Sequence, residues 1–456
     1  MILPMKQSIN GILISAPSSN SGKTTVVCAI LEALKMMGRR PVSFKCGPDY
    51  IDPMFHQKVT DIPSSNLDMY LLNDNTVRYL YASNSLKGDI SVTEGVMGYY
   101  DGLSMTSTGA SSYALSKILG CPAVLVVNVK GMAMSVPALI RGFTDFRPDS
   151  TIRGVIFNGA SDNTYGPLKE AILSEFKGRV RPLGFLPMMK DCSVGSRHLG
   201  LITAREIDDI REKDMKLGRR ALETIDMEGL TELASQSRDI EYEDIFPEEF
   251  PEKIRIALAR DKAFCFYYED GLDLLRKMGA EIVEFSPMED HALPHDIHGL
   301  YLGGGYPELH LDELCSNETM LASVREAVQA GLPTIAECGG FMYIQEAIGE
   351  RKVCGILPGS SGDTGKLVRF GYARMKALKD NLLLKAGQEI PVHEFHHWDS
   401  TEIGSDFTLT KPNGLSRTEC VGWDTLYAGY PHIHLCSDPS AAKNFYRACV
   451  TYKCRK

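Results

Sequence analysis

The chain has 456 residues, of which 44% are hydrophobic, and its 49 Lys and Arg against 58 Asp and Glu give a formal net charge of −9. This length predicts two domains, and the negative charge argues against nucleic acid as a partner, because phosphate-backbone binding requires a basic surface. Twelve cysteines without a C-x-x-C pair argue against a disulfide framework or a zinc site. The short apolar N-terminus and the longest apolar run, Cys121 to Val129, argue against a secretory segment or membrane span, so we expect a cytoplasmic protein.

The first predicted elements are a strand, Gly11 to Ile14, a Ser-rich loop, Ala16 to Thr25, and a helix, Val26 to Met37. A phosphate-binding loop needs backbone N–H groups around the anion, a Lys that bridges phosphates and a hydroxyl for Mg²⁺. Ala16 stands in place of the usual first Gly, displaced by one residue, and in this the loop resembles the longer loops of dethiobiotin synthetases and partition ATPases. We therefore predict an ATP site at Ser21, Gly22, Lys23, Thr24 and Thr25, with Thr24 also a ligand of Mg²⁺.

A second strand, Pro41 to Cys46, leads into a segment rich in turn residues, Gly47 to His56. Its Gly-Pro and Asp-Pro steps predict a rigid, non-helical loop after a strand, where open α/β sheets place ligand contacts. Lys45, at the end of this strand, can reach the same pocket as the phosphate loop. Composition alone leaves open a surface turn with solvated charges.

The third strand, Asp89 to Thr93, ends at Glu94. A carboxylate at the carboxyl end of a parallel strand, beside the phosphate loop, is well placed to hold Mg²⁺, although Glu94 can also serve only to cap a turn. The apolar runs Ala123 to Val129 and Gly154 to Asn158 complete a predicted doubly wound, mostly parallel sheet. Asn158 is either a turn residue or, as in the ATPases that the loop resembles, a contact of the adenine edge.

An acidic segment with two prolines, residues 238–253, predicts a linker. It separates a P-loop domain, residues 1–237, from a second α/β domain, residues 254–456. The second domain restarts a strand–helix–strand pattern at Arg255. No internal repeat or low-complexity tract is evident.

Cys338 lies on a predicted tight turn between a strand, Pro333 to Glu337, and a helix. Such a turn exposes the thiol at the top of the sheet and at a positive helix end, which favours the thiolate and predicts a nucleophile. The N–H of Gly339 and one from the loop with Gly304 and Gly305 are the predicted oxyanion hole, since glycines permit close backbone approach.

The base for this cysteine is sought in a probable strand near the C-terminus, Ala428 to Leu435. Strand alternation places His432 and His434 on one face, and we favour His432. A glycine loop, a Cys turn and a late His resemble class I glutamine amidotransferases, whose triad carries a carboxylate two positions after the His. Here His434 occupies that position.

The segment His393 to His397 reads H-E-F-H-H and fits the zinc motif H-E-x-x-H. That motif requires a helix, whereas Pro391, Val392 and the neighbouring aromatic residues favour a strand or loop. We therefore expect this segment near the substrate or the domain interface, without zinc.

Several motifs in order along nearly the whole chain resemble the cobyrinic acid a,c-diamide synthases. They are K-x-G-P-D-Y-I-D-P, E-G-x-M-G-x-x-D-G, R-H-L-G-L, G-G-G-Y-P-E, E-C-G-G-x-x-Y, H-E-F-H and H-x-H. The resemblance implies a dethiobiotin synthetase-like P-loop domain followed by a class I glutamine amidotransferase-like domain. It also implies Mg²⁺, ATP and glutamine, a corrinoid substrate and amidation of its a and c carboxylates through acyl phosphates. The site residues that it implies are metal ligands Thr24, Glu94 and Asp49, and substrate-binding residues Lys45, Asp49, Tyr50, Asp52, His56, Arg197 and His198.

Two alternatives stay open at this point. Hydrogenobyrinic acid and nickel-sirohydrochlorin a,c-diamide synthases share these motifs and differ in the macrocycle. A partition-type ATPase with a macromolecular partner accounts for the chain only as far as Asn158 and leaves Cys338 and the His pair without a role. The sequence does not give the order of the two amidations, the route of ammonia or the oligomeric state, and the resemblance leaves a homodimer open.

Overall fold

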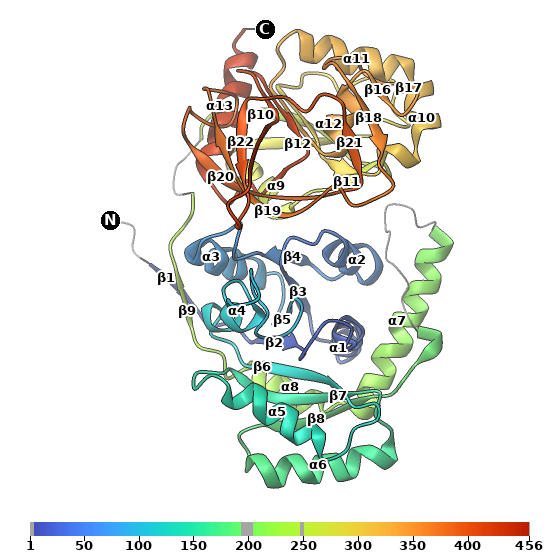
Figure 1. The fold of residues 1–456 in the computed structure, drawn as a ribbon, viewed down its shortest axis with the longest axis vertical. Helices are drawn as coiled ribbons and strands as arrows, with labels where there is room; N and C mark the ends of the chain where they lie inside the picture. The colour runs from blue at the N-terminus through green and yellow to red at the C-terminus, as the bar shows by residue number, and fades with distance from the viewer. Residues whose placement is uncertain (1–3, 193–203, 247–249, 456) are drawn as a thin grey trace. The chain divides into compact units, whose positions relative to one another are not determined.

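The computed structural model describes residues 4–192, 204–246 and 250–455, and the chain divides at Asp244–Ile245 into two compact units (Figure 1). Most contacts between residues fall within one unit or the other. This division lies inside the segment that we predicted as a linker.

A seven-stranded sheet of parallel strands forms the centre of the first unit, in the order β4-β3-β5-β2-β6-β7-β8. Its strands are β2 (Gly11–Ser15), β3 (Pro41–Cys46), β4 (Ser64–Leu67), β5 (Ile90–Glu94), β6 (Ala123–Asn128), β7 (Ile152–Asn158) and β8 (Arg181–Leu186). Almost every residue of these strands is buried, as expected for a parallel sheet covered on both faces. The predicted doubly wound sheet is thereby confirmed.

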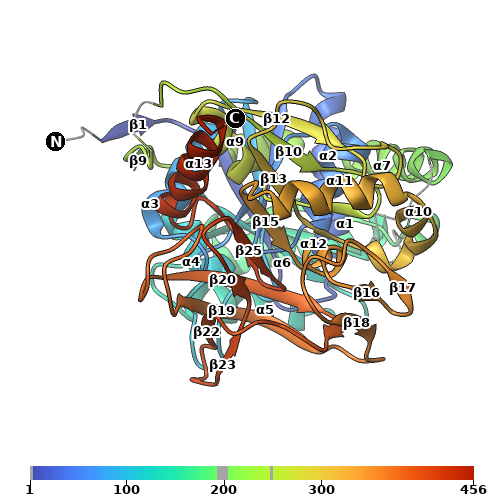
Figure 2. The same cartoon turned by 90° about the horizontal axis from the view of Figure 1, so that it is seen from above.

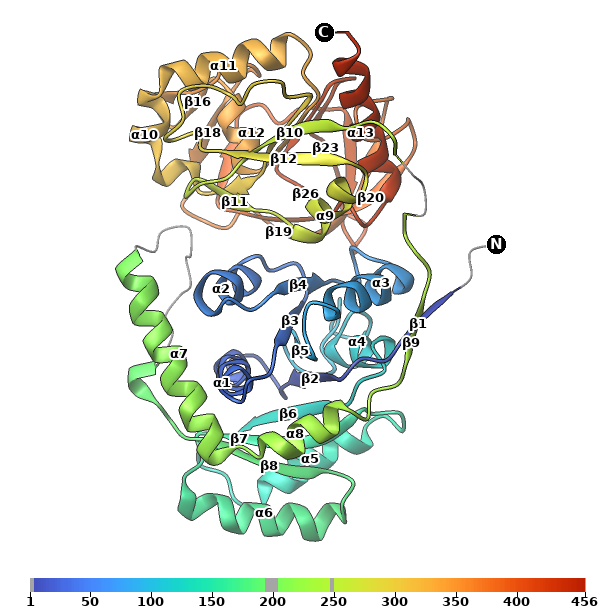
Figure 3. The same cartoon turned by 180° about the vertical axis from the view of Figure 1, so that it is seen from behind.

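Helices cover both faces of this sheet (Figure 3). On one side lie α1 (Lys23–Met36), α2 (Ile51–Thr60) and α7 (Ala204–Thr224), and on the other lie α3 (Asp74–Ser85), α4 (Ser112–Ile118) and α5 (Ser135–Asp145). Near β8 lie α6 (Asp162–Phe176) and α8 (Met227–Ala234). The start of α1 lies at the carboxyl end of β2, where the topology of the sheet places ligands.

Two expectations for the first unit were wrong. Residues 51–60 form helix α2 rather than continuing a non-helical loop, because Pro53 stands in the first turn, where its missing N–H has no intrahelical partner to lose. Residues 240–242, expected as linker, form β9 (Ile240–Tyr242), which pairs antiparallel with β1 (Met5–Gln7). The acidic composition of this segment therefore does not prevent a short edge pairing.

The second unit is built on a six-stranded sheet in the order β12-β10-β13-β15-β25-β24, and Figure 2 shows its first five strands following one another in this order. These strands are β10 (Ile254–Ala259), β12 (Ala280–Phe285), β13 (Gly299–Leu302), β15 (Thr334–Glu337), β24 (Val421–Gly422) and β25 (Leu426–Gly429). All neighbours are parallel except β24 and β25. Helices α9 (Glu269–Lys277) and α13 (Pro439–Lys453) lie at one side, and α10 (Leu311–Ser316) and α11 (Glu318–Gln329) at the other (Figure 2).

Three smaller sheets complete the second unit. Five antiparallel strands follow the order β23-β22-β19-β20-β26, namely β19 (Arg369–Ala377), β20 (Glu389–His396), β22 (Phe407–Thr410), β23 (Ser416–Glu419) and β26 (His432–Ile433). Four more are β16 (Ala347–Ile348), β17 (Arg351–Lys352), β18 (Ser360–Asp363) and β21 (Trp398–Ser400), and the last pair is β11 (Phe264–Phe266) with β14 (Gly304–Gly305). The strand expected over 393–396 is confirmed, so H-E-F-H-H is not the helical zinc motif.

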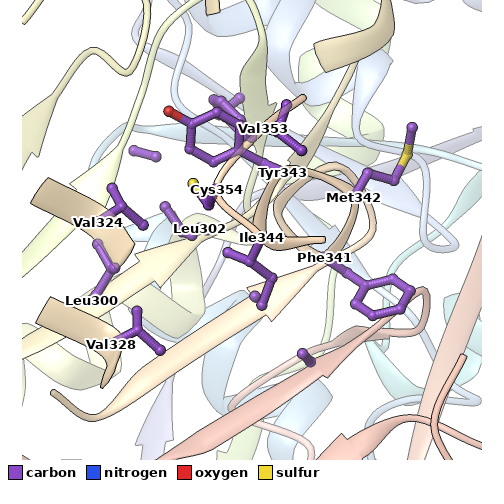
Figure 4. Packing of buried hydrophobic residues seen from close by; sticks show 14 of the residues in the cluster. Leu300, Leu302, Val324, Val328, Phe341, Met342, Tyr343, Ile344, Val353 and Cys354 are labelled. Atoms are coloured by element: carbon purple, nitrogen blue, oxygen red, sulfur yellow. The ribbon is translucent and has the colours of Figure 1, made fainter. Parts of the chain in front are cut away.

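The short helix α12 (Gly339–Ile344) is buried throughout and holds the turn before it in place. Figure 4 shows its side chains spreading into the core from the coil of the helix. They pack among β13 and α11 in a cluster that includes Leu300, Leu302, Val324, Val328, Phe341, Tyr343 and Ile344. This packing makes the turn at residue 338 a rigid platform rather than a surface loop.

None of the helices within the described residues is long and apolar enough to cross a membrane.

Candidate functional site

The phosphate-binding loop of the first unit is preshaped around Gly22, the residue before α1. Gly22 has φ of 82°, and a Cβ there would stand 2.0 Å from Nδ2 of Asn158, so the position requires glycine. Asn158 Nδ2 donates to the carbonyl of Ser21 at 2.9 Å. The amide of Asn158 therefore supports the loop, and its contact with adenine stays a prediction.

Side chains from the ends of β3 and β5 and from the first turns of α1 and α2 converge beside this loop. Thr24 Oγ1 donates to Glu94 Oε1 at 2.6 Å. Lys45 Nζ lies 2.9 Å from the same oxygen and 2.6 Å from Asp52 Oδ2. Lys23 Nζ donates to the carbonyl of Met97 at 2.7 Å. These contacts follow from the parallel topology, because β2, β3 and β5 are neighbours and their carboxyl ends share one edge.

These side chains line a cavity of about 620 Å³, whose wall includes Ser18, Gly22, Lys23, Thr24, Thr25, Lys45, Asp49, Asp52, Glu94 and Met97. Two other surface hollows lie away from these residues. The position of this cavity at the start of α1 and its lysines suit a polyphosphate, because N–H groups and the helix dipole favour an anion there.

Burial tunes the charges of this cavity. Desolvation lowers the pKa of Lys23 to about 8, although Glu94 opposes this shift. Burial would also lower the pKa of Lys45, but the Glu94 and Asp52 carboxylates outweigh it and raise that pKa above its usual value. Burial and the neighbouring Asp52 raise the pKa of Asp49 to about 6. The two carboxylates therefore favour the charged form of Lys45, and an anion beside Lys23 would favour its charged form.

The remaining predicted substrate residues have different surroundings. Asp49 Oδ1 accepts the N–H of Ile51 at 2.9 Å and so also supports the start of α2. Tyr50 and His56 are 9% and 2% exposed and are not among the side chains that line the cavity. Arg197 and His198 lie outside the described residues. The structure thus brings Lys45, Asp49 and Asp52 to the cavity beside the phosphate-binding loop, and the substrate role of all seven residues stays a prediction.

In the second unit, Cys338 has the backbone geometry of a nucleophile turn. It lies between β15 and α12 with φ of 48° and ψ of −103°, a conformation that costs about 1–3 kcal/mol in a residue with a side chain and persists only where packing imposes it. Its N–H donates to the carbonyl of Gly429 at 2.8 Å, which ties the turn to β25. The predicted Cys turn between strand and helix therefore occurs in the structure.

The helix end at Cys338 was expected to favour the thiolate, but burial opposes it. Burial, and next the Glu308 carboxylate, raise the pKa of Cys338 to about 12, and α12 has only six residues. Desolvation outweighs the partial charge of so short a helix. The thiol is consequently protonated at neutral pH and needs a base to act as a nucleophile.

The glycine loop approaches both the cysteine turn and His432. A Cβ on Gly304 would lie 2.4 Å from Cε1 of His432, and one on Gly339 would lie 3.2 Å from the N of Gly305. Gly303 is engaged elsewhere, because its N–H donates to the hydroxyl of Tyr267 at 2.9 Å. Only glycines at 304 and 339 allow these approaches.

The two candidate histidines occupy different environments. His432 lies in β26, opposite His393 of β20, with Nδ1 3.9 Å from Glu337 Oε2. His434 lies beyond the end of β26 and stacks on Tyr268 with ring centroids 4.6 Å apart. The assumption that strand alternation puts both on one face therefore fails, because the strand ends between them. Burial lowers the pKa of each ring to about 3, so both are neutral at pH 7.

Sequence reasoning missed Glu337 and Tyr301, which lie next to this group. Tyr301 Oη donates to Glu337 Oε2 at 3.0 Å, and both residues are buried. The position of Glu337 immediately before the predicted nucleophile was the available signal. Its contact with a strand nearly a hundred residues away was not visible in the sequence.

The first unit carries a phosphate-binding loop, and the second carries a cysteine turn, a histidine and a glycine loop. Family models match both units. The CobQ/CobB/MinD/ParA nucleotide binding domain matches residues 12–201, and the CobB/CobQ-like glutamine amidotransferase domain matches residues 255–440. The chain is a glutamine-dependent ligase that forms amides.

Relatives identify the family within this class. The cobyrinate a,c-diamide synthase of Clostridium tetani is 39% identical over 93% of this chain and 97% of its own length. The enzymes of the same name from Priestia megaterium and Caldanaerobacter subterraneus are 37% and 38% identical, over 97% and 96% of this chain and 97% and 98% of their own lengths. The chain belongs to the cobyrinate a,c-diamide synthase family. The resemblance inferred from the motifs is confirmed.

Proposed function

We propose that the chain uses ATP and glutamine to amidate the a and c carboxylates of cobyrinic acid in the synthesis of cobalamin. The arrangement of Cys338, His432 and the loop at Gly304 supports the part of this proposal that concerns glutamine hydrolysis. The cavity at the phosphate-binding loop supports the part that concerns the use of ATP. We assign the substrate from the names of the relatives, which match this chain over nearly their full lengths.

Glutamine hydrolysis begins at Cys338. His432 takes the thiol proton as the sulfur attacks the amide carbon, and it returns this proton to the leaving nitrogen, so that ammonia and a thioester result. Water then hydrolyses the thioester to glutamate and regenerates the thiol. The N–H groups of Gly339 and of the loop with Gly304 and Gly305 stabilise the oxyanion in both steps. The close approach of Gly304 to His432 supports His432 over His434 as the base.

Amide formation takes place at the other unit. A substrate carboxylate attacks the γ-phosphorus of ATP, ADP leaves, and an acyl phosphate forms. Ammonia then attacks the acyl carbon, and phosphate leaves with the carbonyl restored as an amide. Lys23 and Lys45 neutralise charge on the transferred group, and Asp49 and Asp52 orient the substrate.

The residues at the cavity suit Mg²⁺. Glu94 Oε2 is buried without a hydrogen-bond partner, and Oε1 of the same carboxylate lies against the hydroxyl of Thr24. Carboxylate and hydroxyl oxygens are ligands that Mg²⁺ accepts together with phosphate oxygens. Thr24 and Glu94 would hold the ion, with Asp49 nearby, and the bound ion would neutralise phosphate charge.

Product mass tests this proposal. Purified protein is incubated with ATP, Mg²⁺ and glutamine, in parallel on cobyrinic acid, hydrogenobyrinic acid and nickel-sirohydrochlorin. We expect two amidations of cobyrinic acid with formation of ADP and glutamate. Two amidations of one of the other macrocycles alone would move the assignment to that substrate, and no amidation of any would contradict the proposal. The cytoplasmic location and the homodimer stay predictions.

A further inference from the structure

The position that normally supplies the third member of the triad does not supply a carboxylate in this chain. It is His434, whose Nδ1 accepts the N–H of Cys436 at 3.3 Å while its ring stacks on Tyr268. These contacts engage Nδ1 and one face of the His434 ring. A base that works on a thiol with a pKa of about 12 needs a partner that orients it and stabilises its charge.

A different carboxylate lies beside His432. Glu337 is 2% exposed, and its Oε2 lies 3.9 Å from Nδ1 of His432. Its Oε1 accepts the N–H of Ile433 at 3.0 Å, and its Oε2 accepts the hydroxyl of Tyr301 at 3.0 Å. Both oxygens are therefore fixed by donors, one of them on the strand that carries His432.

We infer that Glu337, the residue immediately before the nucleophile, is the positioning carboxylate of His432 and replaces the carboxylate that is absent at position 434. This inference rests on the proposed roles of Cys338 and His432. The carboxylate acts through His432 alone: it holds the ring with Nε2 available for the thiol and stabilises the imidazolium that forms when the thiol proton is taken. The 3.9 Å separation shortens to a hydrogen bond when His432 gains that proton, since catalytic contacts often tighten during the reaction.

The electrostatics of this pair are consistent with such a role. Burial raises the pKa of Glu337 to about 8 and lowers that of His432 to about 3, so each isolated charge is disfavoured in the same dry site. An ionised Glu337 favours the imidazolium of His432, and the imidazolium in turn favours the ionised carboxylate, so each charge stabilises the other. Among residues 4–192, 204–246 and 250–455, the groups recorded in electrostatic contact with Glu337 are Tyr301, Tyr267, Tyr427, Cys338 and His432, none of which is a Lys or Arg.

Tyr301 links Glu337 to the oxyanion loop. Its ring packs edge-on against Tyr267 with centroids 5.3 Å apart. Tyr267 Oη in turn accepts the N–H of Gly303 and donates to the carbonyl of Ala259. The carboxylate, the base and the glycine loop are thus held by one buried framework, which maintains their relative positions.

The test compares Glu337→Gln, Glu337→Asp and a control, Glu281→Gln, which alters an exposed carboxylate on β12. Glutamate release from glutamine and amidation driven by ammonium are both measured. For Glu337→Gln we expect kcat for glutamine to fall about 100-fold with KM changed less than about threefold, and ammonium-driven amidation to be kept. Glu337→Asp should recover at least a tenth of the lost rate, and Glu281→Gln should behave as wild type.

Two results would overturn the inference. One is a Glu337→Gln enzyme with kcat for glutamine within about threefold of wild type. The other is an equal loss of glutamine- and ammonium-driven amidation, which would mean that Glu337 serves folding only. Should Glu337→Gln fail to fold, Tyr301→Phe tests the inference in its place, because it removes one hydrogen-bond donor from Oε2 of Glu337. We expect Tyr301→Phe to lower kcat for glutamine about tenfold and to keep ammonium-driven amidation. An unchanged kcat would refute the inference. A Cys338→Ala enzyme that still uses glutamine would instead refute the proposed function itself.

Discussion

The substitution Gly304→Ala tests how closely the glycine loop and His432 must approach. The added Cβ would stand 2.4 Å from Cε1 and 3.3 Å from Nε2 of His432, whereas ordinary contact begins at 3.4 Å, so the ring must move by about 1 Å. Because a displacement of about 1 Å in a catalytic group costs about 100-fold in rate, we expect kcat/KM for glutamine to fall by that factor.

The assay separates this local effect from a general loss of structure. Amidation driven by ammonium does not require His432 and is expected to stay within about twofold of wild type. Gly362→Ala is the matched control, because a Cβ at Gly362, in β18 of the same unit, meets nothing within 4 Å. Wild-type kcat/KM for glutamine in Gly304→Ala would refute the close approach, and so would an equal loss in Gly362→Ala.

Three further predictions follow from the same structure. Lys23→Met removes the cation at the start of α1 and should lower amidation more than about 100-fold with either glutamine or ammonium, while alkylation of Cys338 stays at the wild-type rate. Retained amidation would contradict the role of Lys23 in binding phosphate. Because burial raises the pKa of Cys338 to about 12, its alkylation by iodoacetamide without glutamine should rise about tenfold per pH unit from pH 7 to 10, and a plateau below pH 8 would show a resting thiolate. Leu300→Ala, at a fully buried position in the cluster around α12, should lower the free energy of unfolding in urea by about 3 kcal/mol. A change below about 1 kcal/mol would show that the cavity collapses without cost.

Several strands of both sheets could be predicted from the sequence because parallel strands buried on both faces read as continuous apolar runs. Pro41–Cys46 has the predicted bounds, and the residues just after such strands lie at the cavity beside the phosphate-binding loop and at the cysteine turn. This part of the site is predictable because sheet topology places the carboxyl ends of neighbouring strands together.

The wrong predictions relied on local sequence patterns at positions where tertiary packing determines the structure. Pro53 was taken as a helix breaker but lies in the first turn of α2. The helix end was expected to favour the thiolate of Cys338, although burial has the larger effect and raises the pKa of this thiol. His434 was placed in line with His432, although β26 ends at Ile433.

Glu337 shows what the sequence could not give. Its carboxylate is defined by a partner on β13, Tyr301, and by the N–H of Ile433 on β26, both distant in the chain. No periodicity reports such a contact. Its position before Cys338 acquires meaning only once both of these contacts are known.

Transfer of labelled nitrogen tests the central claim most directly. The protein is incubated with cobyrinic acid, ATP, Mg²⁺ and glutamine labelled with ¹⁵N at its side-chain amide, and the product is analysed by mass spectrometry beside that of Cys338→Ala. The account predicts two labelled amides in the wild-type product, none from glutamine with Cys338→Ala, and two unlabelled amides when that variant receives ammonium. Labelled product from Cys338→Ala, or an unamidated substrate with the wild-type enzyme, would contradict it.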